Sequence, residues 1–291
     1  MKLVGTLIQY SCGICLILIA CADSSDYYFD FNEPAEQESS IIGRLTEQYI
    51  QLPEQAISIS KDSSVYAQYA IPTEHYGHGI LGDRVEAQQL VVVADEQFYE
   101  LTLDSNYVYE DIRPRLYDVD GDGYLEIITI RTEISKGAGI VIYKIVHDAL
   151  TEYEIIEEIG TPYRWLNIAA IDDLDDDGVV EIFWIETPHI GGTLKVAEIK
   201  NGILEALSSQ STYSNHAIGL PNLCLSAIPE ESGQKKLYVP NQSGSAINGF
   251  TFTDDNLLPY DTINMIVDFS MPLQDQNNFS YLIMDPVNCI Y

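Results

Sequence analysis

Apolar residues recur along this chain in short runs that alternate like strands, and polar turns separate the runs. The clearest unit lies between residues 167 and 207. Residues 167–171 and 181–185 are apolar runs, 193–200 alternates, Asn201-Gly202 is a type I′ hairpin signal, and 203–207 closes the unit. Four antiparallel strands per unit are typical of a propeller blade. No segment after residue 45 shows helical periodicity with caps, so the sequence predicts an all-β fold.

Two segments of the chain match almost residue for residue. They are DVDGDGYLE at 118–126 and DLDDDGVVE at 173–181, the first and second aspartate loops, and each is followed by a strand-like run. The second lies 55 residues after the first, and a further 55 residues lead to the region of Leu237, which follows a loop at 229–234 without aspartates. A period of this length indicates a solenoid, a propeller or an array.

The number of blades follows from the strand pairs. These pairs are centred near Leu90, Ile127, Ile182, Leu237 and Leu282. We expect a β-propeller of four-stranded antiparallel blades, most simply five, with residues 56–60 and 64–70 completing the last blade. An incomplete ring, or six or seven irregular blades, is the alternative.

The aspartate loops have the donor set of a metal site. Three aspartates at alternate positions and an acid at position nine place four carboxylates close together, which suits a hard cation with six to eight oxygen ligands, namely calcium. An EF-hand is excluded because its position twelve would be Thr129 or Trp184, inside a strand-like run. We expect these ligands, with the seventh residue giving its carbonyl: Asp118, Asp120, Asp122, Tyr124 and Glu126, and Asp173, Asp175, Asp177, Val179 and Glu181.

The aspartate loops resemble the FG-GAP/VCBS repeat, the calcium-binding blade motif of integrin α-chain propellers and of many bacterial exported proteins. The resemblance covers roughly residues 75–285 and implies a propeller and bound calcium. The segments RPR at 113–115, RWLN at 164–167, TPHIGGTL at 187–194 and SNHAIG at 214–219 also resemble an uncharacterised group of proteobacterial FG-GAP proteins. The fourth repeat, IPEESGQKK at 228–236, departs from the motif, and residues 82–86 keep little of it.

The N-terminus reads as an export signal. Met1-Lys2 precedes an apolar run, and LIAC at 18–21 resembles a bacterial lipobox in which Cys21 is lipidated; soluble export after cleavage at the small residues is the alternative. We therefore expect a signal peptide over 1–21, an acidic tether over 22–45 and the propeller over 46–291. The protein would be anchored by its lipid in the bacterial envelope, facing the periplasm, and Ala22 and Asp23 permit sorting to the outer membrane. A Cys224–Cys289 disulfide is one expectation, and two buried thiols are the other.

Composition narrows the possible partners. The chain has 291 residues with 14 Lys and Arg against 45 Asp and Glu, a formal net charge of −31. This charge excludes nucleic acid and contact with an anionic membrane beyond the lipid, because both require a basic face.

A second group of residues is predicted on the rim opposite the aspartate loops. If each aspartate loop joins strands one and two of a blade, the loops before first strands and between strands two and three lie on the other rim. We call this group the histidine rim: His78, Arg164, Trp165, His189 and His216. His189 is expected in a loop between strands two and three, and the other four precede first strands and are expected in connections between blades. Its residues could pack against neighbouring blades or bind a ligand, a protein or a glycan.

Two classes of function stay open. The first is a binding or interaction propeller in which calcium is structural. The second is a hydrolase with an active site on the histidine rim, although no nucleophile–base pair accompanies these residues.

Overall fold

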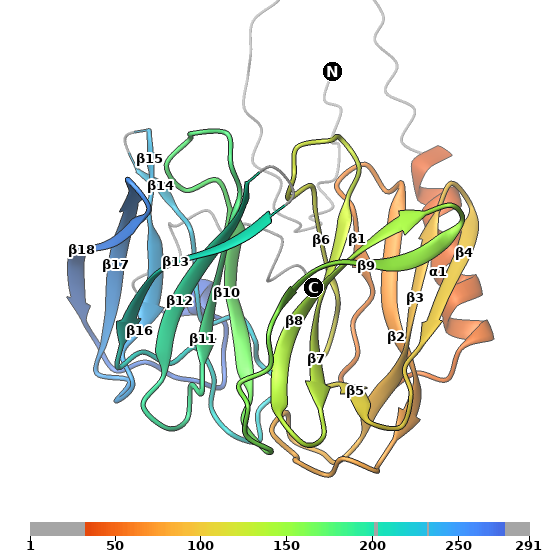
Figure 1. The fold of residues 1–291 in the computed structure, drawn as a ribbon, viewed down its shortest axis with the longest axis horizontal. Helices are drawn as coiled ribbons and strands as arrows, with labels where there is room; N and C mark the ends of the chain where they lie inside the picture. The colour runs from red at the N-terminus through yellow and green to blue at the C-terminus, as the bar shows by residue number, and fades with distance from the viewer. Residues whose placement is uncertain (1–32, 201–202, 232, 277–291) are drawn as a thin grey trace, which may run out of the picture.

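The computed structural model describes residues 33–200, 203–231 and 233–276. These residues form eighteen β-strands, one α-helix and one short 3₁₀ helix, η1 (Leu273–Asp275). The strands stand side by side in consecutive antiparallel sheets (Figure 1). No helix among the described residues is long and apolar enough to cross a membrane.

The sheets follow one another along the chain as blades. The first blade pairs β1 to β4 in order, the second β6 to β9 and the third β10 to β13. Their bounds are β1 (Ser58–Ile59), β2 (Val65–Thr73), β3 (Glu86–Ala94), β4 (Gln97–Thr102), β6 (Arg115–Tyr117), β7 (Glu126–Glu133), β8 (Gly137–Val146), β9 (Ala149–Ile156), β10 (Leu166–Asp172), β11 (Glu181–Glu186), β12 (Thr193–Lys200) and β13 (Ile203–Ser211). The short strand β5 (Tyr107–Tyr109) pairs with both β3 and β7 and joins the first two blades.

The fourth blade is less regular. It contains β16 (Leu237–Pro240), β17 (Ala246–Thr253) and β18 (Asn256–Asn264), and Ala227 bridges to Tyr238 at the place of the inner strand. Between them, β14 (Glu230–Glu231) and β15 (Gln234–Lys235) form a small hairpin where the second and third blades carry an aspartate loop. The expected loss of the motif in this copy therefore corresponds to a different local structure.

The inner strands of successive blades contact one another. Ser58 Oγ donates to Pro114 O at 2.5 Å, and Tyr117 OH donates to Asp172 Oδ1 at 3.2 Å. Ser226 Oγ donates to Ala169 O in the same way. These contacts run from blade to blade in sequence order, as the inner strands of a propeller do.

Each pair of neighbouring blades shares an apolar core. Ile128 and Ile140 of the second blade pack with Ile182 of the third, and Phe183 of the third packs with Phe250 of the fourth. A separate cluster joins the first and second blades. Because both faces of the inner blades are buried, their strands are nearly continuous apolar runs, and the β-propeller predicted from the sequence is confirmed.

Two details of the first blade differ from the sequence interpretation. Residues 56–60 and 64–70 contribute β1 and β2. β1 pairs with β2 and β2 pairs with β3, so these strands belong to the first blade rather than to a last one. Four blades lie in the described residues, and the fifth strand pair, near Leu282, lies outside them. Residues 82–85 belong to the loop between β2 and β3, and Glu86 begins β3. In the first blade, the loop at 60–64 joins β1 to β2 and so holds the position of an aspartate loop.

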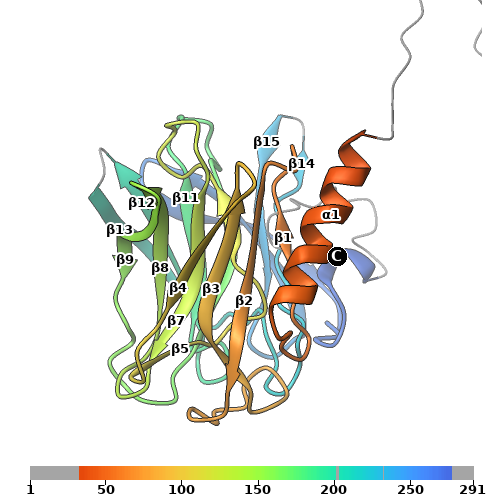
Figure 2. The same ribbon diagram turned by 90° about the vertical axis from the view of Figure 1, so that its right-hand side faces the viewer.

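The prediction of an acidic tether over residues 22–45 is wrong from residue 33 onward. Helix α1 (Glu33–Gln48) begins within it, and Ile41 and Leu45 are buried against Val91 and Val93 of β3. Figure 2 shows α1 lying along the outer face of the first blade. Ile41 and Leu45 are four residues apart and so lie on one helical face. This spacing is a short sign of a helix, and the acidic residues around it obscure it.

Candidate metal centre

Both aspartate loops lie at the same rim of the molecule. The first joins β6 to β7 and the second joins β10 to β11, at the upper edge of the blades (Figure 1). In both loops the sixth residue is a glycine with positive φ, 88° at Gly123 and 89° at Gly178. That conformation favours glycine, and it turns the chain back toward the final acid as the motif predicts.

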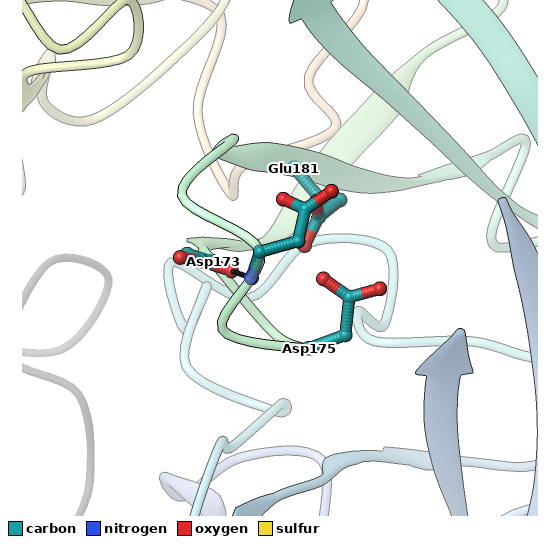
Figure 3. Close-up of side chains that lie close together, drawn as sticks. Asp173, Asp175 and Glu181 are labelled. Atoms are coloured by element: carbon teal, nitrogen blue, oxygen red, sulfur yellow. Dashed lines mark hydrogen bonds between the residues drawn. The ribbon is translucent and has the colours of Figure 1, made fainter. Parts of the chain in front are cut away.

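The second aspartate loop gathers four carboxylates. One oxygen from each of Asp173, Asp175, Asp177 and Glu181 lies within 4.8 Å of the others. The carboxylates of Asp173, Asp175 and Glu181 lie close together inside the loop (Figure 3). Backbone N–H groups hold the outer oxygens: Gly178 N donates to Asp173 Oδ2 at 2.9 Å, and Leu174 N donates to Glu181 Oε2 at 2.8 Å.

Glu181 is the strongest indication of a cation in this loop. It is fully buried, and its second oxygen, Oε1, has no hydrogen-bond partner. Asp175 Oδ1 is likewise buried without a partner. Burial, together with a smaller effect of the neighbouring aspartates, raises the pKa of Glu181 to about 8. Unpartnered, mutually repelling oxygens with no donor among them fit a hard cation.

The first aspartate loop repeats this geometry in part. Asp118, Asp120 and Glu126 bring their oxygens together, but Asp122 lies outside that group. Val119 N donates to Glu126 Oε2 at 2.8 Å, matching the bond from Leu174 to Glu181. Burial raises the pKa of Glu126 to about 7. Tyr124 and Val179 occupy the seventh position of their loops. The expected role of their backbone carbonyls as calcium ligands stays a prediction.

Sequence analysis missed Lys144, the cationic side chain beside the first loop. Its Nζ lies 2.5 Å from Asp120 Oδ2 and 2.8 Å from Asp122 Oδ2. Hydrogen bonding to Lys144 lowers the pKa of Asp122. Lys144 lies in a different strand, 18 residues after Glu126, and only the pairing of β7 with β8 would have placed it here.

The residues of the histidine rim occur on the opposite side of the blades. The loops after β2 and β11, and the segment after β13, lie at the lower edge in Figure 1. His78 is in the first of these loops, inside the first blade; the sequence analysis had placed it in a connection between blades.

Trp165, His189 and His216 form one contact group. The rings of Trp165 and His189 stack with centroids 6.0 Å apart, and His216 lies 4.7 Å from Trp165. His189 Nε2 is 2.8 Å from His216 Nδ1, and His216 Nε2 is 2.7 Å from Leu220 O. The second bond requires Nε2–H on His216, so His189 donates to Nδ1. Burial lowers the pKa of His189 to about 4 and that of His216 to about 3, so both are neutral and weakly basic.

His78 and Arg164 have other partners. His78 Nδ1 is 2.5 Å from Glu110 Oε1, and Trp165 Nε1 donates to Glu110 O at 2.9 Å. Glu110, fully buried, therefore links His78 to the contact group. No motif or spacing in the sequence points to Glu110. Arg164 donates to the carbonyl of Tyr163 at 3.0 Å.

A cavity of about 670 Å³ lies on the aspartate rim, beside the first loop, and is lined by β1, Arg113, Tyr117 and Tyr124.

Cys224 is buried, whereas Cys289, like Cys21 and the signal segment, lies outside the described residues. The Cys224–Cys289 disulfide therefore stays a prediction.

Comparisons with known proteins show similarity of fold only. No family model matches the chain, and no curated protein matches it. Solved structures that are similar include a protein assigned as a 6-phosphogluconolactonase from Bacteroides fragilis, with 13% identity over 73% of this chain and a TM-score of 0.40. An exotype rhamnogalacturonan lyase has 11% identity over 70% of this chain and a TM-score of 0.43. An endo-arabinase from Bacteroides thetaiotaomicron has 11% identity over 74% of this chain, 82% of its own chain and a TM-score of 0.34. The chain spans 57% and 48% of the first two structures.

Proposed function

We propose that the protein is an exported calcium-binding β-propeller that acts as a binding or interaction module, anchored to the bacterial envelope by lipid at Cys21. The observation that carries the calcium proposal is the buried, unpartnered oxygen of Glu181 among three aspartates. The repeated motif and its resemblance to FG-GAP/VCBS loops support the same ion. Bound calcium would neutralise the carboxylates, while this chain's own residues hold the loop in shape through Gly178 and the Leu174 N–H bond.

The histidine rim supports a binding module better than a hydrolase. Both ring nitrogens of His216 form hydrogen bonds within the protein, one to His189 and one to the backbone carbonyl of Leu220. Neither nitrogen is therefore available to a substrate. Within the described residues, the groups of His, Cys, Asp and Glu that could hold a metal are the two aspartate loops, and neither includes a residue of the histidine rim. A protein or glycan ligand remains the expected partner.

Equilibrium dialysis with radioactive calcium tests the calcium proposal. We expect saturable binding with a Kd of about 10⁻⁴–10⁻³ M, the range of extracellular calcium modules. Combining Asp120→Asn with Asp175→Asn should abolish it. The matched control is Asp148→Asn, in the exposed turn between β8 and β9, which should bind as the wild type does. No binding by the wild type at millimolar calcium would contradict the proposal.

A further inference from the structure

The two aspartate loops face different side chains on the neighbouring strand. The register of β11 and β12 pairs Glu181 with Glu198. In the second blade, Ile127 pairs with Tyr143, so the next antiparallel position places Lys144 opposite Glu126. The same position of the blade therefore carries an acid beside one loop and an ammonium group beside the other.

Lys144 lies against the carboxylates of the first loop, although Asp118 Oδ1 and Asp120 Oδ1 are buried there without a hydrogen-bond partner. Besides Asp120 and Asp122, its Nζ lies 3.3 Å from Glu126 Oε1, the counterpart of the unpartnered oxygen of Glu181. The Lys144 side chain is 18% exposed, and its Nζ lies 4.5 Å from the centre of the Tyr153 ring. The ammonium group is thus enclosed in the loop rather than extended into solvent.

The second loop has a lysine nearby that contacts it differently. Lys235 Nζ lies 3.0 Å from Asp172 Oδ1 and 3.5 Å from Asp176 Oδ1, and neither residue is a position of the metal motif. Its third partner is the backbone carbonyl of Asp173, at 2.9 Å. Glu198, opposite Glu181, pairs with Lys200. Among the described residues, no lysine therefore forms an ion pair with the four convergent carboxylates of this loop.

We infer that Lys144 occupies the cation position of the first aspartate loop and thereby makes the second loop the tighter calcium site. The inference rests on the proposed calcium binding. A divalent ion entering the first loop must displace an ammonium group or share the oxygens with it, and two positive charges about 4 Å apart repel strongly in a partly buried site. We expect calcium to bind the first loop at least about tenfold more weakly than the second.

Isothermal titration with calcium chloride tests the inference on the full chain. The wild type should show a tight and a weak class of sites, and Asp175→Asn should remove the tight class. Lys144→Met keeps the side chain's length without its charge, and it should strengthen the weak class at least about tenfold. The matched control is Lys195→Met on β12, whose ammonium group pairs with Glu186 away from both loops; it should change neither class.

The outcomes separate the inference from the proposed function. Two equal classes unchanged by Lys144→Met, or loss of the tight class in Asp120→Asn, would overturn the role of Lys144 and leave calcium binding intact. Absence of calcium binding in the wild type, at both loops, would refute the proposed function itself. If Lys144→Met does not fold, comparison of Asp120→Asn with Asp175→Asn still decides which loop is tighter.

Discussion

At the scale of single residues, Lys144 balances charge that would otherwise be buried and unpaired. Lys144→Met should therefore destabilise the calcium-free protein by about 1–3 kcal/mol, because the buried Glu126 loses its cationic partner. Millimolar calcium should restore most of that loss. The free energy of unfolding measured with urea, in chelator and in calcium, gives both values.

Lys195→Met is the control for this measurement as well. Its pair with Glu186 is partly exposed, so its removal should cost less than about 1 kcal/mol in either condition. Equal losses for the two variants in chelator would contradict the special role of Lys144.

His189 and His216 predict a loss of stability in acid. Their folded pKa values, about 4 and about 3, lie below the ordinary value of 6.5, so between those limits the unfolded chain binds more protons. The two neutral histidines contribute fully to the free energy of unfolding above pH 6.5, and this contribution declines as the pH falls toward 4. His216→Asn should reduce the loss of stability between pH 7 and pH 5 by about 2 kcal/mol, measured by urea unfolding.

His147→Asn provides the comparison for the acid experiment. His147 is exposed in the turn between β8 and β9, so its replacement should leave the pH profile unchanged. A profile identical for wild type and His216→Asn would mean that the buried pair does not resist protonation.

At the scale of elements, helix α1 is a structural part of the first blade. Leu45→Ala should destabilise the protein by about 2–4 kcal/mol, because Leu45 is fully buried against the blade. Glu47→Ala, on the exposed side of the same helix, should change stability by less than about 0.5 kcal/mol. Thermal unfolding followed by circular dichroism compares the two; equal midpoints would mean that α1 does not pack as described.

The elements that sequence analysis predicted best are those whose signal is local. The third blade shows this: its strands, its aspartate loop and the glycine at position six can all be read from consecutive residues. Sequence analysis missed helix α1 because its apolar contact with the blade rests on a short pair, Ile41 and Leu45, and the acidic segment around them is typical of a linker.

Features that depend on strand pairing could not be predicted from the sequence. Residues 56–70 were assigned to the wrong blade because alternation identifies a strand without naming its partner. Lys144 and Glu198 acquire their roles from register alone, and so does the link from His78 through Glu110 to Trp165. The aspartate motif identifies a candidate site, and the neighbouring strand determines its charge.

At the scale of the whole molecule, the net charge of −31 leaves the lipid as the expected means of membrane attachment. Cys21→Ser should release the protein into the soluble fraction when membranes are separated by ultracentrifugation and probed by immunoblotting. Mutation of Cys12 to Ser, within the expected signal peptide, should leave the protein in the membrane fraction. Unchanged membrane association of the Cys21 variant would contradict lipidation at that residue.

Bound calcium is expected to stabilise the folded propeller. A ligand that binds only the folded state stabilises it by RT ln(1 + [L]/Kd), which is about 0.4–1.4 kcal/mol per site for a Kd of about 10⁻⁴–10⁻³ M at about 1 mM calcium. This figure already includes the relief of carboxylate repulsion. For a domain of this size it corresponds to a few degrees in Tm.

The most direct test is the Tm of the wild-type protein in 1 mM calcium and in excess chelator, beside the variant that combines Asp120→Ala with Asp175→Ala. We expect chelation to lower the wild-type Tm by a few degrees without abolishing the folded state, and the variant to unfold at the same temperature in both conditions. If chelator leaves the wild-type melting curve unchanged and no calcium co-purifies with the protein, the aspartate loops are acidic turns that hold no structural ion.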